Sequence, residues 1–158
     1  MIDQNQVWLE MPEPESHPVD LPFLALEDTF VSGDSSNHRI SVRYYQSTDG
    51  ESLLGRVIFG PGTQGPPDHA HGGSMAALMD EAMGGAAWLA GHPVVAAQLN
   101  VKFQAMLPLG KRCVVHARVM ESNGRKIKTS GELRSADGQQ LYCTGEALFV
   151  VLDLNQIG

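Results

Sequence analysis

The sequence is poor in cysteine, which bears on both its redox chemistry and its fold. Its 158 residues include only two cysteines, Cys113 and Cys143, which stand outside any CxxC spacing. Each lies in a segment with strand-like alternation, where cysteine usually packs as a small hydrophobe. We therefore expect both thiols to be reduced, and we expect neither a disulfide framework nor a thiol nucleophile.

The sequence also lacks a basic stripe and a long hydrophobic run. Lysine and arginine number 11 against 18 acids, giving a net charge of −7, so we expect no nucleic-acid partner. No apolar run is long enough to cross a bilayer, and the first ten residues lack the basic and apolar regions of a signal peptide. We expect a cytoplasmic protein with no membrane partner.

Histidines give no recognisable metal pattern. His69 and His71 stand two apart in a loop without a third ligand at a familiar spacing. The remaining histidines are scattered along the chain. We therefore expect no metal site.

Composition divides the chain into an arm, one domain and a tail. Residues 1–37 form an N-terminal arm, which we expect to be extended with one short helix near Phe23–Leu26. A single domain should occupy residues 38–152, and residues 153–158 form the tail. The arm is marked by four of the nine prolines: Pro12, Pro14, Pro18 and Pro22.

Two periodicities predict an α+β fold. Alternation predicts a hairpin over residues 39–59, and steps of three and four residues predict a buried helix at about 74–90. Four more strands follow at 94–105, 113–120, 127–133 and 140–151, the last three joined by Asn-Gly and Asp-Gly pairs typical of type I′ turns. This order predicts an antiparallel sheet of five to six strands wrapped around a central helix.

The start of the helix has the residues of an oxyanion site. Gly72 and Gly73 precede the apolar run, and the first N–H groups of a helix have no internal partner and lie at the positive end of its dipole. Glycine there allows a substrate carbonyl to approach closely. The alternative is a flexible helix start that binds nothing.

Asp80 places a carboxylate in the middle of this apolar helix. A buried carboxylate must be paired, neutralised or functional, and the structural alternative is a hydrogen bond across the core. Asp80 lies on the same helix face as Gly73, with an axial separation of ~10.5 Å. One carbonyl cannot contact both groups of the same helix, so joint action on one substrate predicts a homodimer with two shared sites.

Several motifs, in order along the chain, carry a resemblance to a known family. They are Gly65-Pro66-Pro67, His71-Gly72-Gly73 with Asp80 nine residues after the histidine, Gln98-Leu99-Asn100-Val101, Phe103, Pro108-Leu109-Gly110 and Gly124-Arg125-Lys126. Over about residues 50–151 the chain resembles the hotdog-fold acyl-CoA thioesterases. Within that superfamily it is most similar to the phenylacetate-pathway and mammalian mitochondrial long-chain branch.

This resemblance implies a hotdog fold and hydrolysis of an acyl thioester. The Gly72 N–H would polarise the carbonyl, His71 would support its loop, and Asp80 of the partner subunit would act as general base or as nucleophile. The substrate would contact Gly73, and Arg125 and Lys126 would lie near the coenzyme A phosphates, with ordinary turn solvation as the alternative for these two cations. No cofactor is implied, because coenzyme A enters with the substrate. The implied assembly is a homodimer or a dimer of dimers, which is a homotetramer.

Two positions depart from the family pattern. Ala96 stands where relatives often place a water-holding Ser or Thr, and Gly65 stands where some have Asn. Since side chains alternate along a strand, we expect Gln98 to project from the same side as Ala96 and to replace the missing hydroxyl; His69 is a second substitute. Two other functions stay open: an enoyl-thioester hydratase or dehydratase, and a non-catalytic acyl-thioester binder. Met79 and Met83 are core filler, or one of them lines an acyl tunnel; Trp88 or the arm would cap such a tunnel or simply pack.

Overall fold

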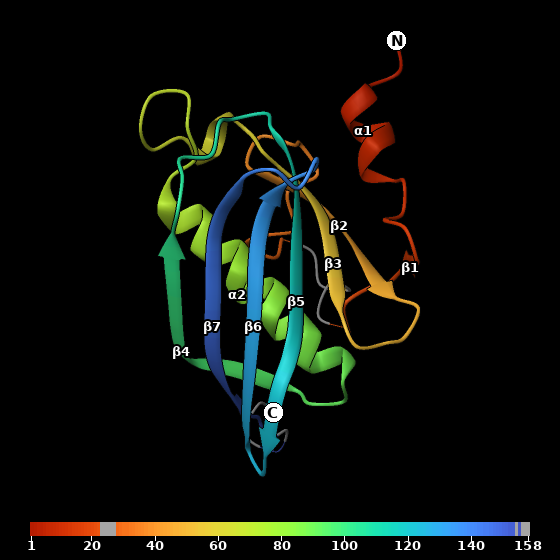
Figure 1. The fold of residues 1–158 in the computed structure, drawn as a ribbon, viewed down its shortest axis with the longest axis vertical. Coiled ribbons are helices and arrows are strands. Elements are labelled where there is room, and N and C mark those ends of the chain that lie inside the picture. The colour runs from red at the N-terminus through yellow and green to blue at the C-terminus, as the bar shows by residue number, and fades with distance from the viewer. Residues whose placement is uncertain (23–27, 154, 156–158) are drawn as a thin grey trace.

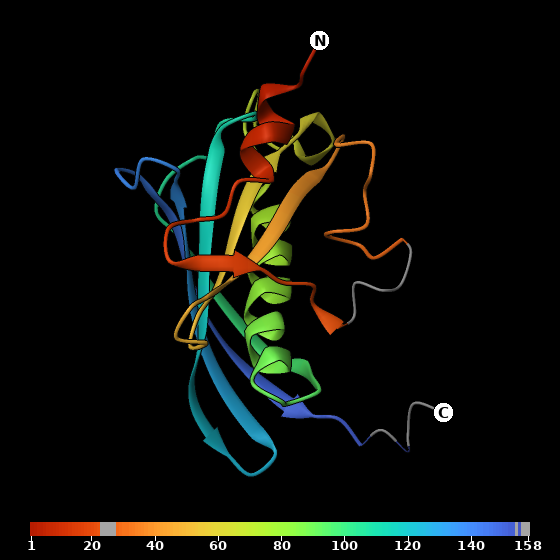
Figure 2. The ribbon, with the colours of Figure 1, turned by 90° about the vertical axis from the view of Figure 1, so that its right-hand side faces the viewer.

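The computed structural model describes residues 1–22, 28–153 and 155, and it shows one curved antiparallel sheet with a long helix along one face (Figures 1 and 2). The sheet order is β1-β2-β3-β5-β6-β7-β4. The helices are α1 (Gln4–Leu9), α2 (Gly72–Leu89) and the 3₁₀ turn η2 (Pro61–Thr63). The strands are β1 (Ser16–Pro18), β2 (Ile40–Ser47), β3 (Leu53–Phe59), β4 (Val94–Phe103), β5 (Arg112–Asn123), β6 (Lys126–Ser135) and β7 (Leu141–Val151).

The six strands predicted from alternation are all present, and the predicted α+β arrangement is confirmed. In the β2–β3 hairpin, Val42 pairs with Val57 and Tyr44 with Gly55, so their side chains share the face that α2 covers. The seventh strand, β1, pairs with β2. The prediction of five to six strands was one short because Ser16–Pro18 is too brief, and too close to prolines, to show alternation.

α2 is the predicted central helix, although it begins two residues before the predicted start at 74. One face of its first half, at Met75, Leu78 and Met79, and all positions from 82 to 87 are buried. A hypothetical Cβ at Gly131 or Gly145 would lie 3.0 Å from the Met79 methyl carbon. These two glycines are paired across β6 and β7, so they make room for the methionine side chains of α2. Met79 and Met83 are therefore core filler.

The two predicted hairpin turns exist, but they are not of type I′. Only the glycine of each pair has positive φ, +59° at Gly124 and +77° at Gly138. Neither Arg125, which is central with Gly124 in the first turn, nor Asp137 is among the residues with positive φ, whereas type I′ requires it at both central positions. The Gly138 N–H donates to Ser135 O at 2.8 Å, which closes the second turn with the glycine at its end. The predicted positions of the two hairpin turns are confirmed, and their predicted type is wrong.

The N-terminal arm is more structured than the extended chain we predicted. α1 begins where the Asp3 carboxylate accepts from the Asn5 N–H at 2.9 Å. Trp8 of α1 contacts two guanidinium groups, Arg56 at 4.9 Å and Arg112 at 5.5 Å from its ring centre. These contacts fix α1 against β3 and β5. The short helix predicted near residues 23–26 lies outside the described residues.

The two cysteines behave as the sequence predicts. Both are free and fully buried. Burial raises the pKa of each thiol to about 12, so neither is ionised near neutral pH.

Candidate active site

His71 starts α2 and organises the loop before it. Its backbone is extended, with φ −65° and ψ 137°, and its Nδ1 accepts a hydrogen bond of 2.8 Å from the Gly73 N–H. Its own N–H donates to Thr63 O at 2.7 Å, which ties it to η2. A Cβ at Gly65 would lie 2.8 Å from the His71 Cα, so the side chain that some relatives carry there does not fit. His71 is thus an N-cap held against a loop with little spare space.

Gly72 presents a free donor at the start of α2. Its N–H makes no hydrogen bond with any residue that the structure describes. The ring of Phe103 lies beside it, 3.4 Å from where a Cβ would stand. An unpaired N–H at the positive end of a helix of 18 residues is a ready hydrogen-bond donor to an oxyanion.

Asp80 is the second notable group of the helix, and it opens onto a cavity of about 570 Å³. Its carboxylate is half-buried, and within the described ranges it has neither a hydrogen-bond partner nor a cation. Burial raises its pKa above the ordinary value of 3.8. The cavity walls are mostly apolar: Phe30, Val31, Ala77, Glu81, Gly84, Trp88, Val94, Val95, Ala96, Phe149 and Leu152 complete the lining. Asp80 is therefore a basic, unpaired carboxylate in an apolar cavity.

The carboxylate of Glu81, next to Asp80, accepts hydrogen bonds, whereas no described residue donates one to Asp80. It accepts hydrogen bonds from Tyr44 OH at 2.8 Å and from Ser32 Oγ at 3.1 Å. Burial raises the pKa of Glu81, and these two donors oppose that rise. The site residues predicted from the sequence did not include Glu81, its partners Tyr44 and Ser32, or the two arm residues that line the cavity, Phe30 and Val31. The inward alternation of Tyr44 was a usable signal; the irregular arm offered none.

Gln98 and Ala96 lie on opposite faces of β4, which corrects the prediction that they share one. Ala96 pairs with Phe149 and Gln98 pairs with Leu148, because a β-bulge interrupts the register between them. Ala96 lines the Asp80 cavity, whereas Gln98 lines a depression on the outer face of the sheet with Lys128. Gln98 therefore does not replace the missing hydroxyl within this chain.

Arg125 and Lys126 lie at the far end of the sheet from Gly72. Phe103, beside Gly72, pairs with Cys143, whereas Lys126 pairs with Val150, seven residues further along β7 and about 24 Å away. Figure 1 shows the β5–β6 turn at the lower end and the start of α2 near the upper end. Arg125 Nη2 donates to Val151 O at 3.3 Å, and both cations are exposed. One chain does not bring these cations to Gly72.

His69 makes a hydrogen bond within the loop that precedes α2. Its Nδ1 donates to Pro67 O at 2.8 Å, since a carbonyl oxygen only accepts. Across the described ranges no group of three His, Cys, Asp or Glu side chains could hold a metal ion. Among the same residues, no helix has the length and hydrophobicity to span a membrane.

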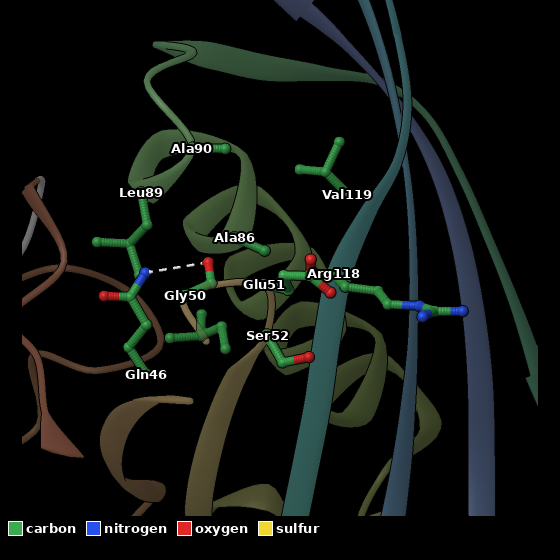
Figure 3. A pocket seen from close by; sticks show the side chains of 10 residues that line it. Gln46, Gly50, Glu51, Ser52, Ala86, Leu89, Ala90, Arg118 and Val119 are labelled. Carbon is green, nitrogen blue, oxygen red and sulfur yellow. Dashed lines mark hydrogen bonds between the residues drawn. The ribbon is translucent and has the colours of Figure 1, made fainter. Parts of the chain in front are cut away.

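A second cavity of about 360 Å³ lies at the other end of α2, beside the β2–β3 turn (Figure 3). Val119 points toward Ala90 and the helix end, while Arg118 points away from the cavity. Gln46 Nε2 donates to Gly50 O across its mouth at 3.5 Å. None of the predicted site residues lines it.

Comparison with solved structures defines the fold. A crystal structure of a thioesterase superfamily protein matches with 37% identity and a TM-score of 0.63, over 70% of this chain and 53% of the other. Zebra fish thioesterase superfamily member 2 shares the fold with a TM-score of 0.64 at 17% identity, over 72% and 81% of the two chains. The single sheet around α2 is thus a hotdog fold.

Sequence comparison leads to the family. A model of the thioesterase superfamily matches residues 68–142, which span the α2 start, Asp80 and β4 to β6. Acyl-coenzyme A thioesterase THEM5 of Homo sapiens is 29% identical over 94% of this chain and 66% of its own length. THEM4 of Xenopus laevis is 38% identical over 59% and 42%. Over residues 68–142 the chain is similar to the thioesterase superfamily, and it spans less than two thirds of the length of these curated relatives.

Proposed function

We propose that this chain hydrolyses an acyl-CoA thioester to the free acid and coenzyme A. The observation that carries the proposal is the unpaired Asp80 carboxylate in its apolar cavity, on the same helix as the unpaired Gly72 N–H. The relatives named acyl-coenzyme A thioesterases support this choice of reaction. A solved thioesterase protein from Streptococcus pneumoniae with coenzyme A shares the fold.

We propose that the site forms between two copies of the chain. Gly72 and Asp80 are eight residues apart on one helix, so ~12 Å separates them along its axis. That distance is too long for one thioester carbonyl to meet both. β4 offers a surface for the second copy, because it is a sheet edge with Val95, Leu99 and Phe103 between 38% and 53% exposed. A homodimer is therefore the smallest active unit, whether or not dimers pair further.

The chemistry then follows from the two groups. The Gly72 N–H of one protomer donates to the carbonyl oxygen and stabilises the oxyanion. As a base, Asp80 of the other protomer takes a proton from water while the water oxygen bonds to the acyl carbon; the C–S bond breaks and the thiolate takes the proton. As a nucleophile, Asp80 bonds to the acyl carbon while the C–S bond breaks and coenzyme A leaves as the thiolate; water then hydrolyses the resulting anhydride to the free acid and the restored carboxylate, and the thiolate takes the released proton. Neither route requires a metal or a bound cofactor.

We further propose that Arg125 and Lys126 contact the coenzyme A phosphates, and that Gly73 contacts the substrate. The two cations are exposed at a turn, where guanidinium and ammonium groups can meet a polyanion. Replacing both by Ala should raise KM and make it less dependent on salt, because fewer charges are screened. An unchanged KM would mean that these two side chains are only solvated at the turn and do not contact the substrate.

Substitution of Asp80 and Gly72 tests the proposal. In a thiol-release assay over short, long and aromatic acyl-CoAs, Asp80→Asn should lower kcat by about 10²-fold or more. Gly72→Pro removes the N–H, and the extended backbone of His71 suits a following proline. Gly72→Ala is the matched control, because it keeps the N–H and places its Cβ 3.4 Å from Phe103. Full turnover by Asp80→Asn or by Gly72→Pro would contradict the proposal.

A non-catalytic acyl-thioester binder is the second candidate, and one observation favours it. Ala96 lines the cavity beside Asp80 without a hydroxyl to hold water. Calorimetric binding of acyl-CoA without thiol release at any chain length would establish this second function. The hydratase alternative lacks such support, because no histidine is among the residues that line the Asp80 cavity.

A further inference from the structure

A short turn of the N-terminal arm lies on the α2 side of the sheet (Figure 2). We call residues 29–33 the arm turn. The Gly33 N–H donates to Thr29 O at 3.0 Å, and the hydroxyls of Thr29 and Ser32 lie 3.3 Å apart. A Cβ at Gly33 would lie 2.4 Å from the Thr29 backbone, so only glycine permits this closure. The arm turn is a compact unit.

Glu81 holds the arm turn against α2. Its Oε2 accepts from Ser32 Oγ, and its Oε1 accepts from Tyr44 OH of β2. Both carboxylate oxygens are thus occupied, one from the arm and one from the sheet. Because Glu81 is partly buried, each of these hydrogen bonds to a charged acceptor is stronger than a fully exposed one.

The residues just before Ser32 form part of the Asp80 cavity wall. Val31 is buried at 6% exposure, whereas Phe30 is 72% exposed at the rim. The Arg39 guanidinium lies over the Phe30 ring, 5.6 Å from its centre. An exposed aromatic ring at the rim of an apolar cavity is a contact surface for an apolar ligand.

We propose that the arm turn is the specificity-determining wall of the acyl site and that Glu81 is the residue that positions it. This rests on the proposed thioesterase function and adds the substrate class to it. The reacting carbonyl lies at Asp80, and a medium or long acyl chain extends from there toward Phe30 and Val31. An acetyl group carries a single methyl beyond the reacting carbonyl, so we expect it not to contact them.

Physical reasoning supports this class of substrate. The apolar walls beyond Asp80 gain stabilisation only if apolar groups displace water from them. The same cavity lining includes the rings of Trp88 and Phe149. Release of Ser32 from Glu81 removes one side of this surface without touching Asp80. Loss of the Ser32–Glu81 hydrogen bond should therefore change which acyl chain is preferred.

Four variants test the inference in the full-length protein. Ser32→Ala removes the donor to Glu81, and Ser32→Thr restores a hydroxyl. Phe30→Ala removes the rim ring. Ser35→Ala is the matched control, because Ser35 is exposed in the same segment and bonds to nothing in the described chain. Two readouts are taken: amide hydrogen exchange of the arm turn, and the ratio of kcat/KM for decanoyl-CoA to that for acetyl-CoA.

The expected results separate the variants. Phe30→Ala lowers the decanoyl-to-acetyl ratio about tenfold, equivalent to about 1.4 kcal/mol. Ser32→Ala lowers it about threefold and speeds exchange of the arm turn; Ser32→Thr and Ser35→Ala match the wild type in both. The loss in Ser32→Ala falls mainly on KM for decanoyl-CoA, which a general loss of stability would not produce.

Other outcomes overturn the inference. An unchanged ratio in Phe30→Ala and Ser32→Ala would do so, as would conversion of Phe30→Ala to a monomer, which would assign that ring to the subunit interface. If the wild type hydrolyses no acyl-CoA, the proposed thioesterase function fails by itself. Hydrogen exchange then still decides whether Glu81 holds the arm turn, because unchanged exchange in Ser32→Ala would refute it.

Discussion

The Nδ1 atom of His71 accepts a hydrogen bond of 2.8 Å from the N–H of Gly73, two residues ahead in the chain. This bond uses one of the first donors of α2 and leaves the neighbouring Gly72 N–H for another acceptor. It also fixes the neutral tautomer of His71, with the proton on Nε2. We therefore infer that the histidine of the motif supports the proposed oxyanion donor through the helix start and does not itself transfer protons.

Replacement of the His71 cap should weaken both the helix and the activity. His71→Ala should lower the free energy of unfolding by about 1 kcal/mol and lower kcat, because the helix start is no longer held. His71→Asn should retain most of both, since asparagine is a strong N-cap. Urea denaturation and thiol release measure the two effects. If His71→Asn is as inactive as His71→Ala, the imidazole has a chemical role that capping does not explain.

The raised pKa of Asp80 predicts a stability change with a definite sign. Below the ordinary pKa of 3.8, Asp80 is protonated in both the folded and the unfolded state, and burying it does not lower the free energy of unfolding. As pH rises through the raised pKa of the folded state, the buried carboxyl becomes charged, and the free energy of unfolding falls. Asp80→Asn should therefore have a higher Tm than the wild type at pH 7, and the gap should close in acid.

Asp137→Asn is the control with the opposite sign. The Ser135 hydroxyl, followed by the Gln139 N–H, lowers the pKa of Asp137. Asp137 thus contributes stability that is present above its ordinary pKa and is lost as pH falls through the folded value. Asp137→Asn should lower the Tm at pH 7 and not in strong acid. A lower Tm for both variants at pH 7 would refute the desolvation of Asp80.

The bulge in β4 predicts that neighbouring positions have different roles. Ala96→Ser adds a hydroxyl inside the Asp80 cavity, where it can hold the attacking water, so kcat should rise about tenfold. Gln98→Ala changes the outer face of the sheet and should alter kcat/KM by less than about twofold. Steady-state kinetics of both variants check this. A severe loss in Gln98→Ala would place Gln98 in an active site formed with another subunit.

Thr129 predicts a stabilising substitution. Its hydroxyl is buried in β6, and no partner for it exists in the described part of the chain. Thr129→Val keeps the shape and removes this cost, so the free energy of unfolding should rise by about 1 kcal/mol. Ser135→Ala, in the same strand, should do the reverse, because that hydroxyl bonds Asp137 at 2.6 Å and the Gln140 N–H at 3.0 Å. Denaturation that ranks the two variants the other way would contradict this reading.

Some of the fold and site could be predicted from local pattern alone. Apolar residues at every second position, such as those around Val42 and Val57, are enough to predict the strands of the β2–β3 hairpin. A carboxylate at Asp80 in an otherwise apolar helix is enough to indicate a candidate site. The rest depends on contacts that no local pattern shows. Ser32 meets Glu81 across 49 residues of chain, and nothing in the residues of β4 marks the bulge that turns Gln98 outward.

The central claim is that Asp80 of one protomer and the Gly72 N–H of its partner act on one carbonyl, and subunit mixing tests it most directly. Asp80→Asn and Gly72→Pro homodimers should each be inactive. Unfolded together and refolded as a mixture, they should recover about a quarter of the wild-type activity, because half the dimers are mixed and each holds one intact site. No recovery, with mixed dimers confirmed by mass spectrometry, would show that the two groups do not act across the interface.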